Sequence, residues 1–207
     1  HGNLEAFEAV LAAFRAEGID RLWCLGDLVG YGANPNECVA RARMTTEFFV
    51  IGNHDAAAVG LEDTSFFNRN ARDAVQWTAT HLSEDNYAWL RGLPLSATSG
   101  GALLVHSSPF EPENWHYISR VADVFNAFNA TTLKTAFVGQ RLERLGHQQH
   151  LLRAEELHVL VGHTEGLEER RDEAQRVAGV VAGLADHVGA HRAPPGGRDG
   201  PFLPLLP

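Results

Sequence analysis

Three short polar clusters, each directly after an apolar run, constrain the fold of this chain more than any other feature. The clusters are Gly26-Asp27, Gly52-Asn53-His54-Asp55 and Val105-His106-Ser107-Ser108-Pro109. The apolar runs before them, at residues 22–25, 48–51 and 102–105, are short and rich in branched or aromatic residues, which is typical of buried strands. Open α/β sheets build their sites at the carboxyl ends of such strands. We therefore expect Asp, Asn and His side chains to gather at one edge of a sheet.

Helical patterns lie between these strands. An apolar stripe at helical spacing runs from Leu4 to Phe14 and ends before Gly18, and Asn34-Pro35 is typical of a helix start. Further helices are predicted over residues 68–81, 83–92 and 119–128, and strands over residues 21–25, 47–51, 94–97, 102–105 and 134–138. Ser99-Gly100-Gly101 predicts a hairpin turn. Alternating strands and helices indicate a layered α/β fold with a partly parallel sheet.

Size, composition and charge exclude some classes of protein. The 207 residues, 44% of them apolar, are enough for one domain with a core, and no apolar run approaches the length of a membrane span. The net charge of -9 leaves no basic face for nucleic acid, but bound metal could still attract a phosphorylated substrate. Cys24 and Cys38 are expected as buried thiols, and the cytoplasm is the expected location. The oligomeric state cannot be read from the sequence.

The composition changes near residue 140. Residues 1–139 hold all four Trp, all three Tyr and ten of the eleven Phe, with every Ser, Asn, Ile, Lys and Cys. We predict a domain over residues 1–139 and a divergent tail over residues 140–207. Two explanations of the tail stay open: an out-of-frame or otherwise foreign, disordered translation, and a genuine helical extension that ends in Pro and Gly. The chain begins with His1 and has one Met, so we also expect a natural start to be missing.

The side chains in the clusters suit divalent metal ions. Asp27 offers two hard oxygens and can bridge two cations, and Gly26 lets the backbone approach closely there. Asn53 supplies a neutral amide oxygen, and His106 after its own strand is a candidate imidazole ligand. His1 would be another. A pair of metals held by such donors suits the hydrolysis of phosphate esters.

Two further residues of the second cluster suit proton transfer. We expect His54 to point toward a substrate, where its imidazole could protonate a departing alkoxide. Asp55 could orient His54 or raise its basicity. An isolated Asn-His-Asp is more often an Asx turn, and we interpret His81 and His116 as structural. The order of the clusters is what favours a functional interpretation.

That order, starting with His1-Gly2-Asn3 and continuing through the three clusters, resembles the calcineurin-like metallophosphoesterase superfamily. Residues 24–37 are especially similar to its small bacterial branch, which is related to diadenosine tetraphosphatases and phosphodiesterases. The resemblance implies a four-layer α/β/β/α sandwich with two divalent metals, Mn, Fe or Zn, between its sheets. It assigns Asp27 as the bridge, Asn53 and His106 to one metal, His1 to the other, and His54 as the catalytic histidine. A hydroxide bridging the metals would attack phosphorus in line.

The chain departs from the family pattern at both ends of the motif series. The Asp of the family's Asp-x-His motif would precede His1 by two residues, and its strand is missing. The family's Gly-His-x-His motif should follow the strand at residues 134–138, but Gly139 is followed by Gln140 and Leu142. A second candidate is Gly162-His163-Thr164-Glu165, in which His163 could be a ligand.

We therefore expect a metal-dependent phosphomonoesterase or phosphodiesterase that acts on a small phosphorylated substrate. The alternative is an inactive relative that binds a nucleotide or a protein partner in the same cleft. Residues 56–92 are the candidate region for substrate selection, although core packing also explains their helical stripes.

Overall fold

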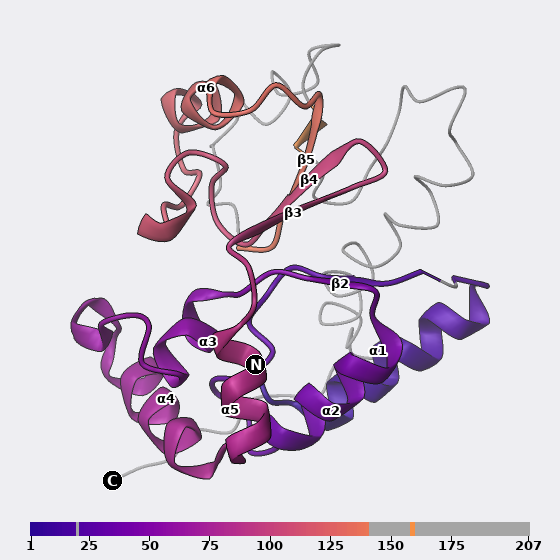
Figure 1. Ribbon diagram of the computed structural model, residues 1–207, viewed down its shortest axis with the longest axis vertical. Coiled ribbons are helices and arrows are strands. Elements are labelled where there is room, and N and C mark those ends of the chain that lie inside the picture. The colour runs from indigo at the N-terminus through magenta and orange to yellow at the C-terminus, as the bar shows by residue number, and fades with distance from the viewer. Residues whose placement is uncertain (20, 141–157, 160–207) are drawn as a thin grey trace, which may run out of the picture.

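The computed structural model describes residues 1–19, 21–140 and 158–159 (Figure 1). Most of the predicted tail and the second candidate metal motif around His163 lie outside these residues. The domain boundary at residue 139 therefore stays a prediction. None of the described helices is long and apolar enough to cross a membrane.

The helices begin where the sequence supplies caps. They are α1 (Leu4–Ala16), α2 (Pro35–Thr45), α3 (Asn53–Ala58), α4 (Arg69–His81), α5 (Glu84–Arg91) and α6 (Val121–Asn129), with short 3-10 turns η1 (Thr64–Phe66) and η2 (Pro112–Asn114). The side chains of Asn3, Asn68 and Ser83 each accept from a backbone N–H in the first turn of α1, α4 and α5, which satisfies a donor that the helix leaves free. Helix α6 starts two residues later than predicted, because the Asp123 carboxylate accepts from the N–H groups of Ser119 and Arg120.

Two sheets contain the strands. One pairs β1 (Trp23–Cys24) with β2 (Phe48–Phe49) in parallel; the other has the order β3 (Ser96–Ser99), β4 (Ala102–Val105), β5 (Thr135–Val138) and β6 (His158–Val159). The β3–β4 pair is antiparallel and β4, β5 and β6 are parallel. The hairpin turn is confirmed, with positive φ at Gly100 and Gly101.

The observed strands differ from the prediction at their ends. Strands β1 and β2 are shorter than residues 21–25 and 47–51, because only two residue pairs align before the chains turn into the polar loops. Strand β3 begins two residues later than residue 94, since Pro94 has no N–H to donate to a ladder.

Successive side chains of each strand point to opposite faces of its sheet, and their contacts define the layers of the molecule. Trp23 and Phe48 pack in one cluster with Leu104 of the other sheet, so this cluster lies between the sheets. Cys24 and Phe49 point the other way, into a core shared with the helices. Beyond the second sheet, Val105 and Val138 pack against α6, through Val124 and Ala127 among others. The order is therefore helices α1–α5, sheet, sheet and α6, as Figure 1 shows, which matches the expected α/β/β/α sandwich.

Candidate active site

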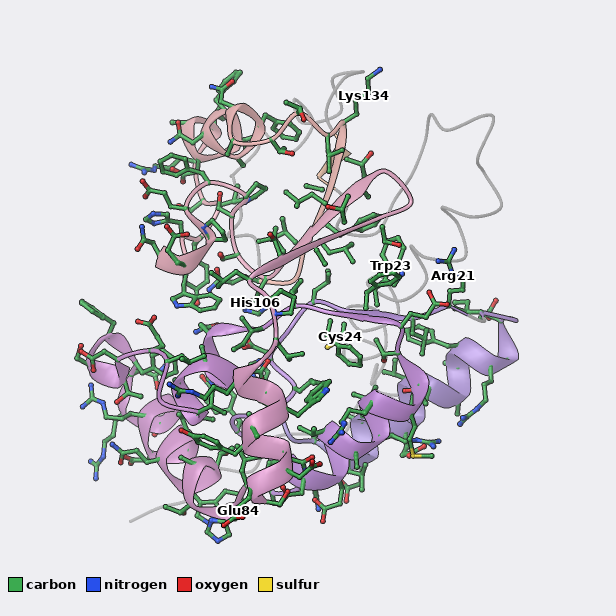
Figure 2. All side chains as sticks on the ribbon, in the orientation of Figure 1. Arg21, Trp23, Cys24, Glu84, His106 and Lys134 are labelled. Carbon is green, nitrogen blue, oxygen red and sulfur yellow. The ribbon has the colours of Figure 1, made fainter. Side chains whose placement is uncertain are left out.

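The loops that follow β1, β2 and β4 meet where the two sheets face each other, and His106 lies at this junction (Figure 2). Gly26 makes the close approach possible. Its φ is 92°, and a Cβ atom there would lie 2.5 Å from the Gly52 nitrogen and 2.8 Å from His106 Nδ1. Asp27 itself has a φ of 57°, a left-handed conformation that disfavours an L-residue by about 1 kcal/mol. The turn thus directs the Asp27 carboxylate back over the sheet ends.

The Asp27 carboxylate has an imidazole on each side. Its Oδ2 atom lies 3.5 Å from His1 Nε2 and 3.3 Å from His106 Nε2, and its Oδ1 accepts from the His54 backbone N–H at 3.1 Å. Burial alone would raise the pKa of Asp27, but His106 and His54 outweigh burial and lower it. Asp27 is therefore a partly buried, ionised carboxylate in position to face two cations.

His106 is held in one orientation. Its Nδ1 lies 2.6 Å from the Leu25 carbonyl oxygen, and its Nε2 lies 3.1 Å from Asn53 Oδ1. With Nδ1–H donating to Leu25, the lone pair of Nε2 faces oxygens of Asp27 and Asn53, an arrangement that needs either a proton or a cation. Burial alone would lower the pKa of His106, but Asp27 and the Leu25 carbonyl raise it.

The donor spacing fits a metal ion. Ligand atoms bound about 2.1 Å from one ion, at right angles to each other, lie about 3 Å apart. The separations of 3.1 Å and 3.3 Å among Asn53, Asp27 and His106 are of this size. The ligand atoms of His1, Asp27 and His54 also lie within 4.8 Å of one another. Asp27 belongs to both sets, so the described residues could hold two ions that share it.

His54 lies closer to the possible metal ligands than the sequence suggested. Its ring centroid is 4.7 Å from that of His1, while Tyr31 and Phe67 cover it at 4.9 Å and 5.0 Å. Its Nδ1 atom is buried and has no hydrogen-bond partner among the described residues. Burial lowers the pKa of His54 although Asp27 opposes the shift, so the imidazole is neutral at pH 7. The catalytic role of His54 stays a prediction, and ligation is a second role within its reach.

Asp55 binds the backbone rather than an imidazole. Its Oδ1 accepts from Val29 N–H at 3.0 Å and its Oδ2 from Gly52 N–H at 3.1 Å. The residue is fully buried, and burial, followed by the charge of Asp27, raises its pKa to about 6. In the described part of the chain no hydrogen bond joins Asp55 to His54, so the predicted effect of Asp55 on His54 would have to act through the loop backbone.

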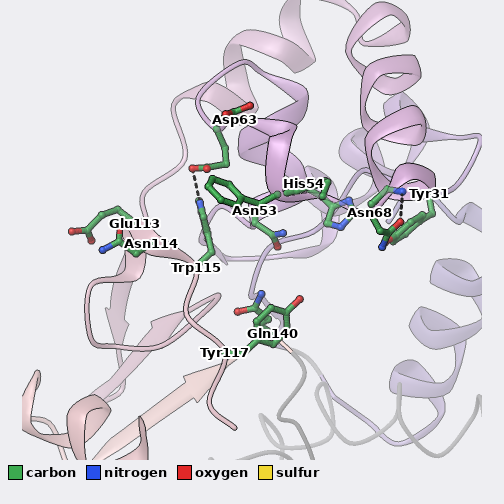
Figure 3. A pocket seen from close by; sticks show the side chains of 14 residues that line it. Tyr31, Asn53, His54, Asp63, Asn68, Glu113, Asn114, Trp115, Tyr117 and Gln140 are labelled. Carbon is green, nitrogen blue, oxygen red and sulfur yellow. Dashed lines mark hydrogen bonds between the residues drawn. The ribbon is translucent and has the colours of Figure 1, made fainter.

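A cleft of about 490 Å³ opens beside Asn53 and His54 (Figure 3). Its lining comes from four separate parts of the chain: Tyr31, Asn53, His54, Glu62, Asp63, Phe66, Phe67, Asn68, Ala71, Glu113, Asn114, Trp115, Tyr117 and Gln140. The sequence pattern singled out Gln140 only as a departure from a motif. Its N–H donates to the His106 carbonyl at 2.6 Å, the residue is 8% exposed, and its Oε1 has no partner among the described residues.

The two histidines interpreted as structural have partners other than Asp27. His81 Nδ1 lies 2.7 Å from the Trp77 carbonyl oxygen, and the His81 ring stacks on Trp77. His116 Nε2 lies 3.2 Å from Glu111 Oε2. These contacts favour the structural interpretation.

Comparison with curated proteins finds two informative relatives. Uncharacterized protein MJ0912 of Methanocaldococcus jannaschii is 41% identical over 132 residues, which cover 61% of this chain and 54% of the relative. A symmetrical bis(5'-nucleosyl)-tetraphosphatase of Aromatoleum aromaticum is 34% identical over 91 residues, which cover 42% of this chain and 33% of the relative. The chain thus spans about half, or less, of the length of these relatives.

Solved structures and a family model agree with the sequence resemblance. A metallophosphoesterase from Sphaerobacter thermophilus is 40% identical, with a TM-score of 0.55 over 67% of this chain and 56% of that one. Hypothetical protein PH1004 from Pyrococcus horikoshii, 18% identical with a TM-score of 0.55 over 66% of this chain and 64% of its own, supports the fold alone. The model of the family described as calcineurin-like phosphoesterase matches residues 1–179. The expected resemblance and fold class are confirmed, and the chain belongs to the calcineurin-like phosphoesterase family.

Proposed function

We propose that this protein hydrolyses a phosphoester bond of a small phosphorylated substrate with the help of two divalent metal ions. The observation that carries the proposal is the position of Asp27, whose Oδ2 lies 3.5 Å from His1 Nε2 and 3.3 Å from His106 Nε2. One carboxylate between two sets of nitrogen and oxygen donors is the arrangement that a pair of ions requires. Membership in a family of metal-dependent phosphoesterases supports the same reaction class.

Within this proposal, each side chain has a stated part. His106 and Asn53 would hold one ion, His1 the other, and Asp27 both. Bound ions of the Mn, Fe or Zn type would offset charge on the phosphoryl oxygens and acidify a water. The Leu25 carbonyl keeps the proton of His106 on Nδ1 and so leaves Nε2 free for an ion.

His54 has the part of the proton donor to the leaving group. It lines the cleft beside Asn53, so a substrate in the cleft would place its leaving oxygen within reach. The low pKa that burial gives His54 keeps it neutral in the free protein. An anionic phosphoryl group beside the ring would raise that pKa and favour the protonated form.

Metal titration and a generic diester test the proposal. The protein, stripped with chelator, is titrated with Mn²⁺ by calorimetry and assayed with bis(p-nitrophenyl) phosphate. We expect two equivalents of Mn²⁺ and hydrolysis that Asp27→Ala abolishes. The matched control is Asp73→Asn, which removes an exposed carboxylate paired with Arg69 on α4 and should change neither result.

The outcomes separate the candidate functions. Two equivalents of metal with no hydrolysis would favour the alternative of an inactive relative that binds in the same cleft. Binding of less than one equivalent would overturn the metal assignment itself.

A further inference from the structure

Gln140 lies beside His106, because the hydrogen bonds between β4 and β5 continue past the end of both strands. Gly139 N–H donates to the Val105 carbonyl at 3.2 Å, and Gln140 N–H donates to the His106 carbonyl at 2.6 Å. A Cβ atom at Gly139 would lie 3.2 Å from His106 Nδ1, so the two strand ends are in close contact. The backbone therefore fixes Gln140 next to a candidate metal ligand.

The Gln140 side chain is buried but leaves its carbonyl oxygen without a partner. The residue is 8% exposed, and no described residue donates to its Oε1 atom. Gln140 lines the same cleft as Asn53, and Figure 3 shows their side chains facing each other. A buried carbonyl oxygen is unfavourable unless a donor or a cation satisfies it. This oxygen is therefore placed for something that binds in the cleft.

A metal ion would satisfy this oxygen. His106 Nε2 lies 3.1 Å from Asn53 Oδ1 and 3.3 Å from Asp27 Oδ2. These three protein ligands are fewer than the roughly four to six ligands that a divalent ion takes. A glutamine carbonyl oxygen is an established type of ligand for such ions. No Lys or Arg among the described residues lines the cleft, so no cationic side chain competes for the oxygen of Gln140.

We propose that Gln140 Oε1 is a ligand of the ion on the His106 side and shifts the preference of that side from Zn²⁺ toward Mn²⁺. The inference rests on the proposed function, since it requires an ion between Asp27 and His106. With Gln140 included, the ligands on this side are three oxygens and one nitrogen. Carboxylate and carbonyl oxygens suit Mn²⁺, whereas imidazole nitrogens suit Zn²⁺. The other side of Asp27, where the ligand atoms of His1 and His54 lie, is richer in nitrogen.

Metal binding tests the inference without relying on catalysis. The protein, stripped with chelator, is titrated with Mn²⁺ and with Zn²⁺ by calorimetry. Gln140→Met removes the oxygen and keeps the length of the side chain, so one Mn²⁺ binding step should weaken by at least about 10-fold. Gln140→His should raise the ratio of Zn²⁺ affinity to Mn²⁺ affinity by at least about 10-fold. The matched control is Gln76→Met, on the exposed face of α4, which should change neither affinity.

Bound water distinguishes direct ligation from a hydrogen bond to a water on the metal. With one equivalent of Mn²⁺ bound, the relaxation rate of water protons increases with the number of water molecules on the ion. Loss of a protein ligand in Gln140→Met should admit one more water and increase this rate, and Gln76→Met should leave the rate unchanged. An unchanged or lower rate in Gln140→Met would mean that Oε1 accepts from a water, and it would overturn the inference.

A second variant keeps the test decisive if Gln140→Met does not fold, which urea denaturation shows. Gln140→Glu retains an oxygen at the same distance along the side chain and adds a negative charge. If Oε1 is a ligand, this variant should bind Mn²⁺ at least as tightly as the unaltered protein. Weaker Mn²⁺ binding by folded Gln140→Glu would overturn the inference.

The remaining outcomes separate this inference from the proposed function. Unchanged Mn²⁺ affinity in Gln140→Met, with hydrolysis of bis(p-nitrophenyl) phosphate intact in the unaltered protein, overturns the inference while the proposed function stands. Mn²⁺ binding that Gln140→Met weakens, without hydrolysis by the unaltered protein, supports the ligand and overturns the proposed function. An equal ratio of Zn²⁺ to Mn²⁺ affinity in the unaltered protein and in Gln140→His overturns the assigned preference.

Discussion

The two sides of Asp27 differ in how firmly they are built. On one side, the His106 side chain is 3% exposed, is fixed by the Leu25 carbonyl and follows a strand paired on both edges. On the other, the His1 side chain is 42% exposed, and His54 Nδ1 is buried without a partner among the described residues. Binding is tightest where donors are held before the ion arrives. The contrast predicts that an ion on the His106 side would meet donors that are already in place. An ion on the other side would have to order the exposed His1 side chain as it binds.

The largest effect should follow the loss of the residue that both sides share. Asp27→Ala removes a carboxylate that faces both donor sets, and we expect hydrolysis of the generic diester to fall more than about 10³-fold, because several kcal/mol of charge stabilisation are lost. Calorimetry should show that binding at both metal sites is weakened. If one Mn²⁺ still binds with unchanged affinity, Asp27 is not shared.

The two sides should separate when their histidines are removed one at a time. His106→Ala should abolish the tighter of two binding steps for Mn²⁺, with a decrease in affinity of at least about 100-fold. His1→Ala should affect only the weaker step, since His1 is more exposed. Calorimetric titration of each variant gives both affinities. If His106→Ala weakened only the weaker step, or His1→Ala the tighter one, the difference between the two sides of Asp27 would be contradicted.

His54 provides a sharper test, because two roles are within its reach. If His54 is the proton donor, His54→Ala should lower kcat by roughly 10²- to 10⁴-fold and leave the affinity for Mn²⁺ unchanged. The loss should be larger for a methyl ester than for a p-nitrophenyl ester, whose leaving group needs less protonation. An equal loss for both esters, together with weaker Mn²⁺ binding, would instead assign His54 as a ligand on the His1 side.

The buried Asp55 side chain joins the loop after β1, through Val29 N–H, to the loop after β2, through Gly52 N–H. The stability of the protein should therefore depend on it. Asp55→Asn keeps one acceptor for Val29 N–H or Gly52 N–H but turns an amide NH₂ toward the other donor. We expect the free energy of unfolding to fall by about 1–3 kcal/mol, as measured by urea denaturation. Asp123→Asn, which changes the side chain that accepts from the Arg120 N–H at the start of α6, should lower the free energy of unfolding by about 1 kcal/mol. A smaller loss for Asp55→Asn than for Asp123→Asn would contradict the role of Asp55 as the link between the two loops.

The individual helices and strands could be predicted from the sequence, whereas the pairing of strands far apart in the chain could not. Helices α4 and α5 could be predicted because each apolar stripe is contained in a single segment, and the structure adds that Asn68 and Ser83 cap them. Strand β4 was predicted from four apolar residues before His106. That β4 pairs with β5 in parallel, which brings Gln140 beside His106, depends on packing between segments more than 30 residues apart, for which no local pattern exists.

The same distinction applies to the site. Asp27, Asn53 and His106 could be brought together in advance, because strand ends of a parallel arrangement meet at one edge. The aromatic and acidic residues that line the cleft could not be brought together in this way. Trp115 reaches Glu62 across 53 positions of the chain, and Tyr31 covers His54 only because the loop after β1 folds over α3. Aromatic and acidic residues in loops carry no periodic signal, so only the folded chain shows that they line one cleft.

The smallest expected effect concerns the thiols beneath and beside the site. Burial, with the charge of Asp55 adding to it, raises the pKa of Cys24 to about 12, and burial also raises the pKa of Cys38. Both thiols should therefore remain protonated at pH 8 and react with a disulfide reagent much more slowly than in urea. Cys24 lies two residues before Gly26, under the loop that carries Asp27, whereas Cys38 lies in α2. Because bound Mn²⁺ would hold that loop closed, it should slow the labelling of Cys24, followed by mass spectrometry, and leave that of Cys38 unchanged. Equal protection of both thiols would mean that metal stabilises the whole domain rather than the junction around Asp27.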